Sequence, residues 1–126
     1  MLLDTNALIW AQQGNPRLGR NTSRRLEQAS AIYFSPISVL EVEIKTMRQK
    51  IAGAKNFYAN LITDGFTEIR LSGLHAEAIR EFTSLALHDP FDRVLLATAA
   101  YENMSFVTSD RKILDLNLAY VIDAQD

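Results

Sequence analysis

The stretch HDPFDRVLLATAAYENMSFVT, residues 88–108, predicts a helix followed by a buried strand. Asp89-Pro90 is a typical helix start, because the first turn of a helix tolerates the missing N–H of proline. From Val94 to Ala100 the helix is apolar on most sides, which indicates that it packs in the centre of the molecule. A buried helix that leads into a short apolar strand is typical of a layered α/β protein.

Short strands and helices alternate along the rest of the chain. The expected strands are residues 2–4, 31–34, 66–71, 105–108 and 118–122. The expected helices are residues 6–12, 15–28, 35–51, 55–62, 72–85, 89–103 and 109–114. In the third helix an apolar stripe with a 3.6-residue period is expected to face the core: Ile37, Leu40, Ile44, Met47 and Ile51. This alternation predicts an α/β fold with a parallel sheet and helices on both faces.

The composition is that of an ordinary globular domain. The chain has 126 residues, 48% hydrophobic and 22% charged, which suits one domain over residues 1–126. It has no cysteine, which excludes disulfides and thiolate metal sites and agrees with the reducing cytoplasm where we expect the protein to act. We expect no membrane segment and see no signal-peptide pattern. Because the formal net charge is −2, a nucleic-acid partner requires a local basic patch or a bound cation.

Acidic residues fall at the ends of predicted strands and in the helices that follow, and at the start of the central helix: Asp4, Glu41, Asp89, Asp92 and Asp110. Sites in parallel α/β sheets form outside the carboxyl ends of the strands, so we expect these side chains to meet at one edge. Carboxylates in contact repel one another unless a cation holds them. Oxygen ligands with open positions suit Mg²⁺ or Mn²⁺.

Each acid also has a purely structural interpretation. Asp4, Asp89 and Asp110 precede helices and can cap them. Asp92 can complement a helix dipole, and Glu41 can form an ion pair with Lys45 four residues later. These explanations are ordinary one by one, but together they leave unexplained why acids from separate segments gather at one edge of the sheet. The two histidines, His75 and His88, are not paired in sequence, so we expect ordinary surface or hydrogen-bonded roles for them and no zinc site.

Four segments in this order, MLLDTNALIW, SPISVLEVEIK, HDPFDRVLLATA and FVTSDRKIL, resemble the successive motifs of PIN-domain ribonucleases. They most resemble the VapC-type toxins of type II toxin–antitoxin pairs, and the resemblance covers residues 1 to about 122. It implies the PIN fold, with a central five-stranded parallel sheet flanked by helices on both faces. It also implies cleavage of RNA with Mg²⁺ or Mn²⁺.

Carried over residue by residue, the resemblance assigns catalysis and metal binding to Asp4, Glu41, Asp92 and Asp110. Asp89 is assigned to capping, with an outer role beside the metal. Asn6 departs from many close relatives, which carry His there, although Asn is common in the wider family. Asn6 and Thr108 are further candidates to orient carboxylates by hydrogen bonding. Candidate phosphate contacts are Lys45, Arg93 and Arg111, which lie beside the acids in sequence.

The resemblance implies two kinds of partner besides RNA: a cognate antitoxin protein, and a second copy of the chain in a homodimer or a toxin–antitoxin hetero-oligomer. One alternative is a catalytically silent PIN-like module that binds RNA or protein; the presence of all four acids argues against it. Another is a phosphotransfer protein with Asp4 as nucleophile. Dehalogenase-like enzymes of that class carry a second acid two residues later, where this chain has Asn6.

Overall fold

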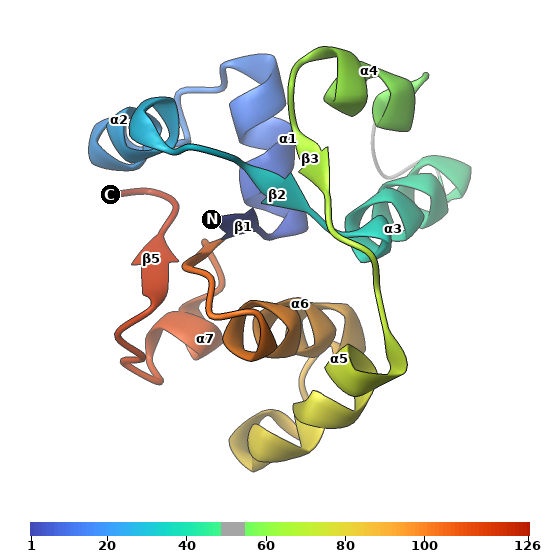
Figure 1. The fold of residues 1–126 in the computed structure, drawn as a ribbon, viewed down its shortest axis with the longest axis vertical. Helices are drawn as coiled ribbons and strands as arrows, with labels where there is room; N and C mark the ends of the chain where they lie inside the picture. Colours follow the sequence, from blue (N-terminus) through green and yellow to red (C-terminus); the bar gives the residue numbers. More distant parts are fainter. Residues whose placement is uncertain (49–54) are drawn as a thin grey trace.

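The computed structural model describes residues 1–48 and 55–126 (Figure 1). Its strands are β1 (Leu2–Leu3), β2 (Tyr33–Phe34), β3 (Thr67–Glu68), β4 (Phe106–Thr108) and β5 (Val121–Asp123). Its α-helices are α1 (Thr5–Gln13), α2 (Arg20–Gln28), α3 (Pro36–Met47), α4 (Phe57–Thr63), α5 (Gly73–Glu77), α6 (Pro90–Tyr101) and α7 (Arg111–Leu114). Two 3₁₀ turns, η1 (Ala78–Glu81) and η2 (Thr83–Leu85), lie between α5 and α6.

The five strands form one parallel sheet in the order β3-β2-β1-β4-β5. Strand β1 is central, and Leu2 lies opposite both Tyr33 of β2 and Phe106 of β4. All strands therefore end at the same edge of the sheet. The predicted α/β class, with a five-stranded parallel sheet, is confirmed.

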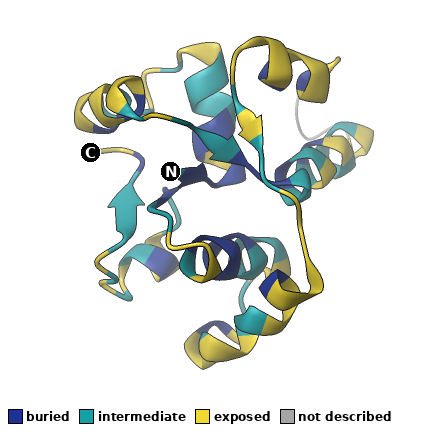
Figure 2. Cartoon of the chain, viewed as in Figure 1, coloured by how far each residue is buried: buried dark blue, intermediate teal, exposed yellow. Residues whose placement is uncertain are grey.

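Helices cover both faces of this sheet, as predicted (Figure 1). Successive residues of a strand point to opposite faces, so Leu2 and Leu3 enter different cores. Leu3 packs with buried residues of α1–α4, whereas Leu2 packs with those of α6 and α7. Figure 2 shows the buried residues concentrated in β1 and along α6. Within the described residues, every helix is too short or too polar to span a bilayer.

The central helix is the part of the fold that the sequence predicts best. Asp89 caps α6 with its side chain, because Asp89 Oδ1 accepts the Phe91 N–H at 2.8 Å. Five consecutive residues of α6, from Leu95 to Ala99, are buried. The helix therefore packs in the interior, as its apolar composition indicates.

The start of α2 differs from the prediction. The sequence predicts a helix from Asn15-Pro16, but α2 begins at Arg20. Asn15 lies in a turn instead, where its side-chain oxygen accepts the Arg17 N–H at 2.9 Å. The reason lies at Gly19, where the backbone approaches the end of the chain. A Cβ at Gly19 would lie 2.1 Å from the carbonyl oxygen of Asp126, which accepts the N–H of Thr22 at 3.1 Å.

The apolar stripe predicted for α3 is buried only in part: Ile37 packs against the core, but other members do not. The buried residues of α3 are Ser38 and Val42, whereas Leu40 is 47% exposed and Met47 is 81% exposed. Ile51, the last residue of the predicted stripe, lies outside the described residues. Hydrophobic period alone cannot say which side of a helix is buried. In α3, Ser38 contacts Thr5 of α1 and Val42 joins the core.

The helix predicted from Ser72 to Leu85 is shorter than expected. Ser72 caps α5, as predicted, but α5 ends at Glu77 and the chain continues as η1 and η2. Residues three apart share a face in a 3₁₀ turn. This spacing places Phe82 and Leu85 against the core beside α6.

Candidate functional site

The site lies where the chain leaves β1 and β4 at the carboxyl edge of the sheet. From β1 it turns into α1 on one face, and from β4 it turns into α7 on the other. Adjacent parallel strands whose connections go to opposite faces leave a crevice between them, which is the usual place of a site in such sheets. Asp4 follows β1 and Asp110 follows β4, so both acids border this crevice.

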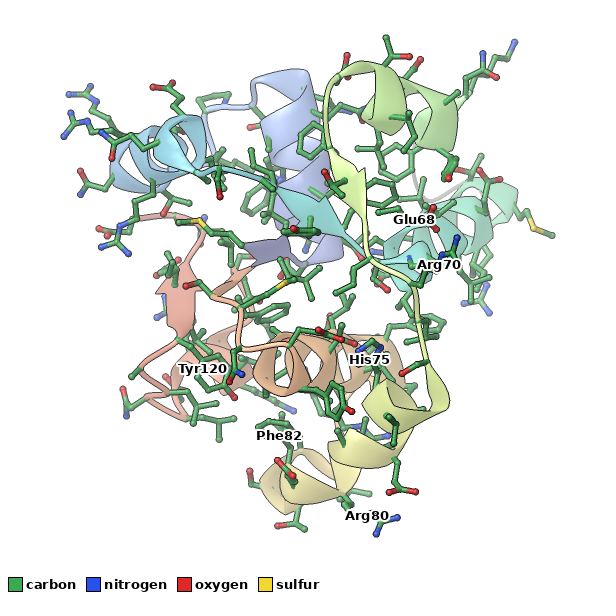
Figure 3. The ribbon with its side chains drawn as sticks, in the orientation of Figure 1. Glu68, Arg70, His75, Arg80, Phe82 and Tyr120 are labelled. Carbon is green, nitrogen blue, oxygen red and sulfur yellow. The ribbon has the colours of Figure 1, made fainter. Side chains whose placement is uncertain are left out.

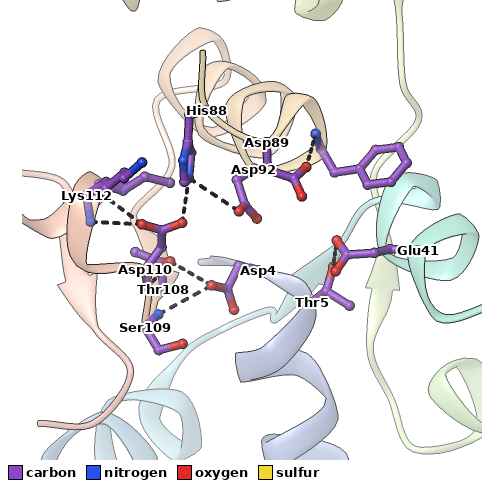
Figure 4. A network of polar contacts seen from close by, with 12 residues as sticks. Asp4, Thr5, Glu41, His88, Asp89, Asp92, Thr108, Ser109, Asp110 and Lys112 are labelled. Atoms are coloured by element: carbon purple, nitrogen blue, oxygen red, sulfur yellow. Dashed lines mark hydrogen bonds and ion pairs between the residues drawn. The ribbon is translucent and has the colours of Figure 1, made fainter. Parts of the chain in front are cut away.

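Asp4 is almost completely buried, with 4% of its surface exposed. Its Oδ1 accepts the Ala7 N–H at 2.7 Å, which caps α1. Its Oδ2 accepts the Thr108 hydroxyl at 2.6 Å and the Ser109 N–H at 3.3 Å, across the boundary between β1 and β4 (Figure 4). Asp4 is therefore both a helix cap and a buried acid held in one orientation.

Asp110 is also a cap, and it faces a histidine. Its Oδ1 accepts the N–H groups of Lys112 at 2.9 Å and Ile113 at 3.3 Å, at the start of α7. Its Oδ2 lies 2.6 Å from His88 Nε2 (Figure 4). The Thr108 hydroxyl accepts the Asp110 N–H at 3.0 Å, so Thr108 joins Asp110 to Asp4.

Glu41 approaches from α3, on the other side of Asp4. Its Oε1 accepts the hydroxyl of Thr5 at 3.1 Å, and its Oε2 pairs with Lys45 Nζ at 2.7 Å. The Glu41 side chain is only 13% exposed, so this ion pair is more than a contact between solvated surface groups. Thr5 also lies 3.0 Å from Ser38 Oγ, which fixes the first turn of α1 against α3.

Asp92 differs from the other acids because it caps nothing. It lies in the first turn of α6 with 24% of its side chain exposed, and His88 Nε2 lies 3.5 Å from its Oδ2. Within residues 1–48 and 55–126 no N–H or hydroxyl group donates to it at normal hydrogen-bond distance. Asp92 is thus a largely buried carboxylate without a strong donor.

A pocket of about 330 Å³ connects these groups. It is lined by Asp4, Thr5, Asn6, Glu41, Ile44, Lys45, Arg48, Asp89, Phe91 and Asp92. Among these residues are four acids and two basic residues, so the formal charge of the lining is negative. Asp110 and His88 lie next to the pocket, on the far side of Asp92 (Figure 4).

The crowding of acids shifts their pKa values. Burial, with the neighbouring charges of Asp89, Glu41, Asp4 and Asp110, raises the pKa of Asp92 to about 8. Burial also raises the pKa of Asp4, although its hydrogen bonds from Thr108, Ala7 and Ser109 oppose the change. At Asp110 burial acts in the same direction, but the hydrogen bond and charge of His88 and the Ile113 N–H together lower the pKa.

The structure brings together most of the residues proposed from the sequence. Asp4, Glu41, Asp89 and Asp92 share the pocket with Asn6 and Lys45, and Asp110 and Thr108 adjoin it. The other two candidate phosphate contacts lie outside the pocket lining. Arg111 is exposed at the start of α7, and Arg93 has a buried Nε without a hydrogen-bond partner among the described residues.

Two residues of the site were not singled out from the sequence. His88 is hydrogen-bonded, as expected, but its partner is Asp110, a proposed ligand, and Asp92 Oδ2 lies 3.5 Å from the same ring nitrogen. His88 lies just before the Asp89 cap of α6, and its partner Asp110 is 22 residues away, so no local signal in the sequence joins them. Arg48, at the end of α3, lines the pocket and follows Glu41 at a spacing of seven residues, which returns to the same helix face.

The donor set of the site fits a divalent cation. Every acid offers hard oxygen atoms, which Mg²⁺ and Mn²⁺ prefer. Three ligand atoms, one each from His88, Asp92 and Asp110, lie within 4.8 Å of one another. Asp92 has no competing strong donor, and a cation would relieve the repulsion that raises its pKa.

Known structures resemble this fold. A toxin–antitoxin complex from Klebsiella pneumoniae contains a chain 22% identical, with a TM-score of 0.68 over 98% of this chain and 96% of that one. VapBC2 from Rickettsia felis, bound to a DNA fragment from its promoter, contains a chain that is 20% identical, with a TM-score of 0.65 over 96% of this chain and 94% of that one. FitAcB from Neisseria gonorrhoeae contains a chain that is 18% identical, with a TM-score of 0.61 over 98% of this chain and 96% of that one. At these identities the likeness is one of fold.

The sequence itself identifies the family. None of the curated proteins compared with the chain matches it. The PIN domain family, in contrast, matches residues 1–117, which span β1 to the end of α7 and all the acids described above. The chain belongs to the PIN domain family.

Proposed function

We propose that this protein is a metal-dependent endoribonuclease that hydrolyses RNA phosphodiester bonds, a toxin of the VapC type. The observation that carries the proposal is the state of Asp92, a largely buried carboxylate with four acidic neighbours and no strong hydrogen-bond donor. Such a group is costly to keep ionised unless a cation binds it. Membership of the PIN domain family and the position at the carboxyl edge of the sheet support the same assignment.

The proposed ligands of Mg²⁺ or Mn²⁺ are Asp4, Glu41, Asp92 and Asp110. When bound, the cation activates water and stabilises charge on the phosphate and the leaving oxygen. It also gives an acidic pocket its attraction for a polyanion, which the net charge of −2 does not provide.

The remaining polar residues position these ligands and the substrate. Thr108 donates to Asp4, and Lys45 pairs with Glu41, so both acids keep one orientation before RNA arrives. We assign outer positions to Asn6 and Asp89, which line the pocket without a place in the ligand set.

Basic groups around the pocket are assigned to the RNA backbone. Lys45 and Arg48 line the pocket, and Arg111 is exposed beside Asp110. Contacts of this kind hold phosphates without reading sequence. Arg93 was one of the three candidates proposed from the sequence, and its buried Nε makes it the weakest, because phosphate contact requires an accessible guanidinium.

We further propose a protein antitoxin as partner, in a homodimer or a toxin–antitoxin hetero-oligomer. One of the similar structures is described as a toxin–antitoxin complex, which supports this assignment by likeness of fold. Exposed apolar side chains on α3 and α4, such as Met47 and Ile62, offer surface that a protein partner can cover.

Purified, partner-free protein tests the enzymatic proposal. With Mn²⁺ or Mg²⁺ it should cleave single-stranded RNA, and a chelator should stop the reaction until the metal is restored. Cleavage that continues undiminished in chelator would overturn the metal mechanism. RNA binding without cleavage under all metal conditions would favour the alternative, a silent PIN-like binding module.

A further inference from the structure

His88 stands out because one ring nitrogen faces two different carboxylates. His88 Nε2 lies 2.6 Å from Asp110 Oδ2 and 3.5 Å from Asp92 Oδ2. The side chain is only 14% exposed, so the three groups meet in a partly desolvated place (Figure 4). Their ligand atoms all lie within 4.8 Å of one another.

Each of the three groups is held by the backbone around it. The His88 N–H donates to the carbonyl of Leu85 at 2.9 Å, which fixes the turn before α6. Asp110 Oδ1 is occupied by two N–H groups of α7, so its Oδ2 is the oxygen turned to the histidine. Asp92 lies in the first turn of α6, whose Asp89 cap directly follows His88. The convergence is therefore built by three local structures.

A hydrogen bond from His88 explains only one of the two approaches. Nε2 carries at most one hydrogen, and at 2.6 Å that hydrogen goes to Asp110. The 3.5 Å separation from Asp92 is too long for a second good hydrogen bond. Two carboxylate oxygens and one imidazole nitrogen within 4.8 Å of one another match the donor atoms of a transition-metal position.

We propose that His88 is a metal ligand, which with Asp92 and Asp110 forms a mixed nitrogen–oxygen cation position beside the pocket of Asp4, Glu41 and Asp89. Asp92 and Asp110 belong to both this position and the ligand set proposed above. The inference deepens the proposed function and rests on it for the identity of the carboxylate ligands. An imidazole donor shifts preference away from Mg²⁺ and toward Mn²⁺ and Zn²⁺.

Pulsed electron paramagnetic resonance of bound Mn²⁺ tests this without RNA or turnover. A coordinated histidine adds nitrogen-14 modulation to the Mn²⁺ signal, and the chain has only two histidines. The expected result is modulation in the wild type that His88→Gln removes. Glutamine keeps a hydrogen-bond donor near the position of Nε2 but offers no imidazole nitrogen.

His75→Gln is the matched control. His75 is 3% exposed, accepts the Ser72 N–H and contacts Glu102 at 2.7 Å, between α5 and α6 (Figure 3). The modulation should survive this change. If either variant fails to fold, wild-type protein labelled with nitrogen-15 histidine replaces it, because the label must then alter the modulation.

Metal affinity gives a second readout. Titration of Mn²⁺ and of Mg²⁺, each followed by calorimetry, should show that His88→Gln weakens Mn²⁺ binding by at least ~10-fold and changes Mg²⁺ binding much less. Absence of nitrogen modulation in the wild type, or equal losses for the two metals, would overturn the inference. RNA cleavage is measured separately, so a protein that binds Mn²⁺ through His88 yet cleaves no RNA overturns only the proposed function.

Discussion

The side chain of Asp4 stabilises two parts of the fold at once, the start of α1 and the end of β4. One oxygen caps α1 through the Ala7 N–H, and the other accepts the hydroxyl of Thr108, the last residue of β4. A carboxylate has about four acceptor positions, so these contacts and the Ser109 N–H leave room for one further partner. At this scale capping and metal binding are compatible roles of the same residue.

Thr108→Val should remove a donor from a buried carboxylate while keeping the shape of the side chain. Because Asp4 and the Asp110 N–H both lose a partner, we expect a loss of about 1–3 kcal/mol in unfolding free energy, measured by urea denaturation without metal.

Thr98→Val is the matched control for that change. Thr98 is equally buried, but its hydroxyl donates to the Val94 carbonyl of the same helix. That carbonyl can accept the backbone N–H of residue 98 in any case, so losing the hydroxyl leaves no group unpaired. A loss in Thr98→Val as large as in Thr108→Val would show that Thr108 does not support Asp4 in particular.

Asp89→Asn should retain far more nuclease activity than Asp92→Asn. Asparagine caps a helix about as well as aspartate, and Asp89 caps α6. Asp92 caps nothing, so its change removes the charge of a proposed ligand. Initial rates of RNA cleavage at saturating Mn²⁺ decide the order, and the opposite order would assign the ligand role to Asp89.

At the scale of elements, helix starts carry the chemistry. The caps of α1 and α7 and the first turn of α6 each bring an acid to the carboxyl edge of the sheet, and α3 adds Glu41 from its second turn. Sequence was enough to predict this arrangement, because Asp-Pro, Ser-Pro and strand-ending acids are local signals. It was not enough to predict His88, whose partner Asp110 is 22 residues away.

The faces of helices were harder to predict than their positions. The period of α3 is helical, but its buried residues are Ser38 and Val42, because α3 packs mainly against α1 and α6, and the period does not reveal that arrangement. The start of α2 was missed for a similar reason. Gly19 looks like a flexible residue in sequence, and only the fold places the backbone of Asp126 against it.

Gly19→Ala should therefore strongly lower the stability of the folded protein. Its Cβ would overlap backbone atoms of residues 125 and 126, and overpacking of this kind costs about 1–3 kcal/mol. In Gly73→Ala, the control, the new Cβ has nothing within 4 Å, so stability should be unchanged or slightly higher. Equal melting temperatures of the two variants would contradict the close approach of α2 and the chain end.

At the scale of the whole molecule, the acid cluster should make metal-free stability depend on pH. The folded protein holds a proton on Asp92 up to a pKa of about 8, whereas the unfolded chain releases it near 3.8. Unfolding between these values releases a proton, so stability should fall as pH rises through this range. Asp4, with its raised pKa, acts in the same direction.

Thermal melts in chelator should show this fall, and Asp92→Asn should reduce it, because asparagine does not titrate. Asp110 has a lowered pKa, so it adds to the stability of the fold at neutral pH and loses that contribution only at acidic pH. It therefore does not mask the fall in stability between pH 3.8 and about 8. If the melting temperatures of the wild type and of Asp92→Asn changed equally with pH, the raised pKa of Asp92 would be contradicted.

The most direct test of the account is a calorimetric titration of Mn²⁺ into metal-free protein, without RNA or partner, at neutral pH. We predict saturable binding to the wild type and binding at least ~10-fold weaker to Asp92→Asn, with both proteins folded by circular dichroism. Equal Mn²⁺ affinity in the two proteins, or no binding to the wild type, would contradict the claim that these carboxylates form a cation site.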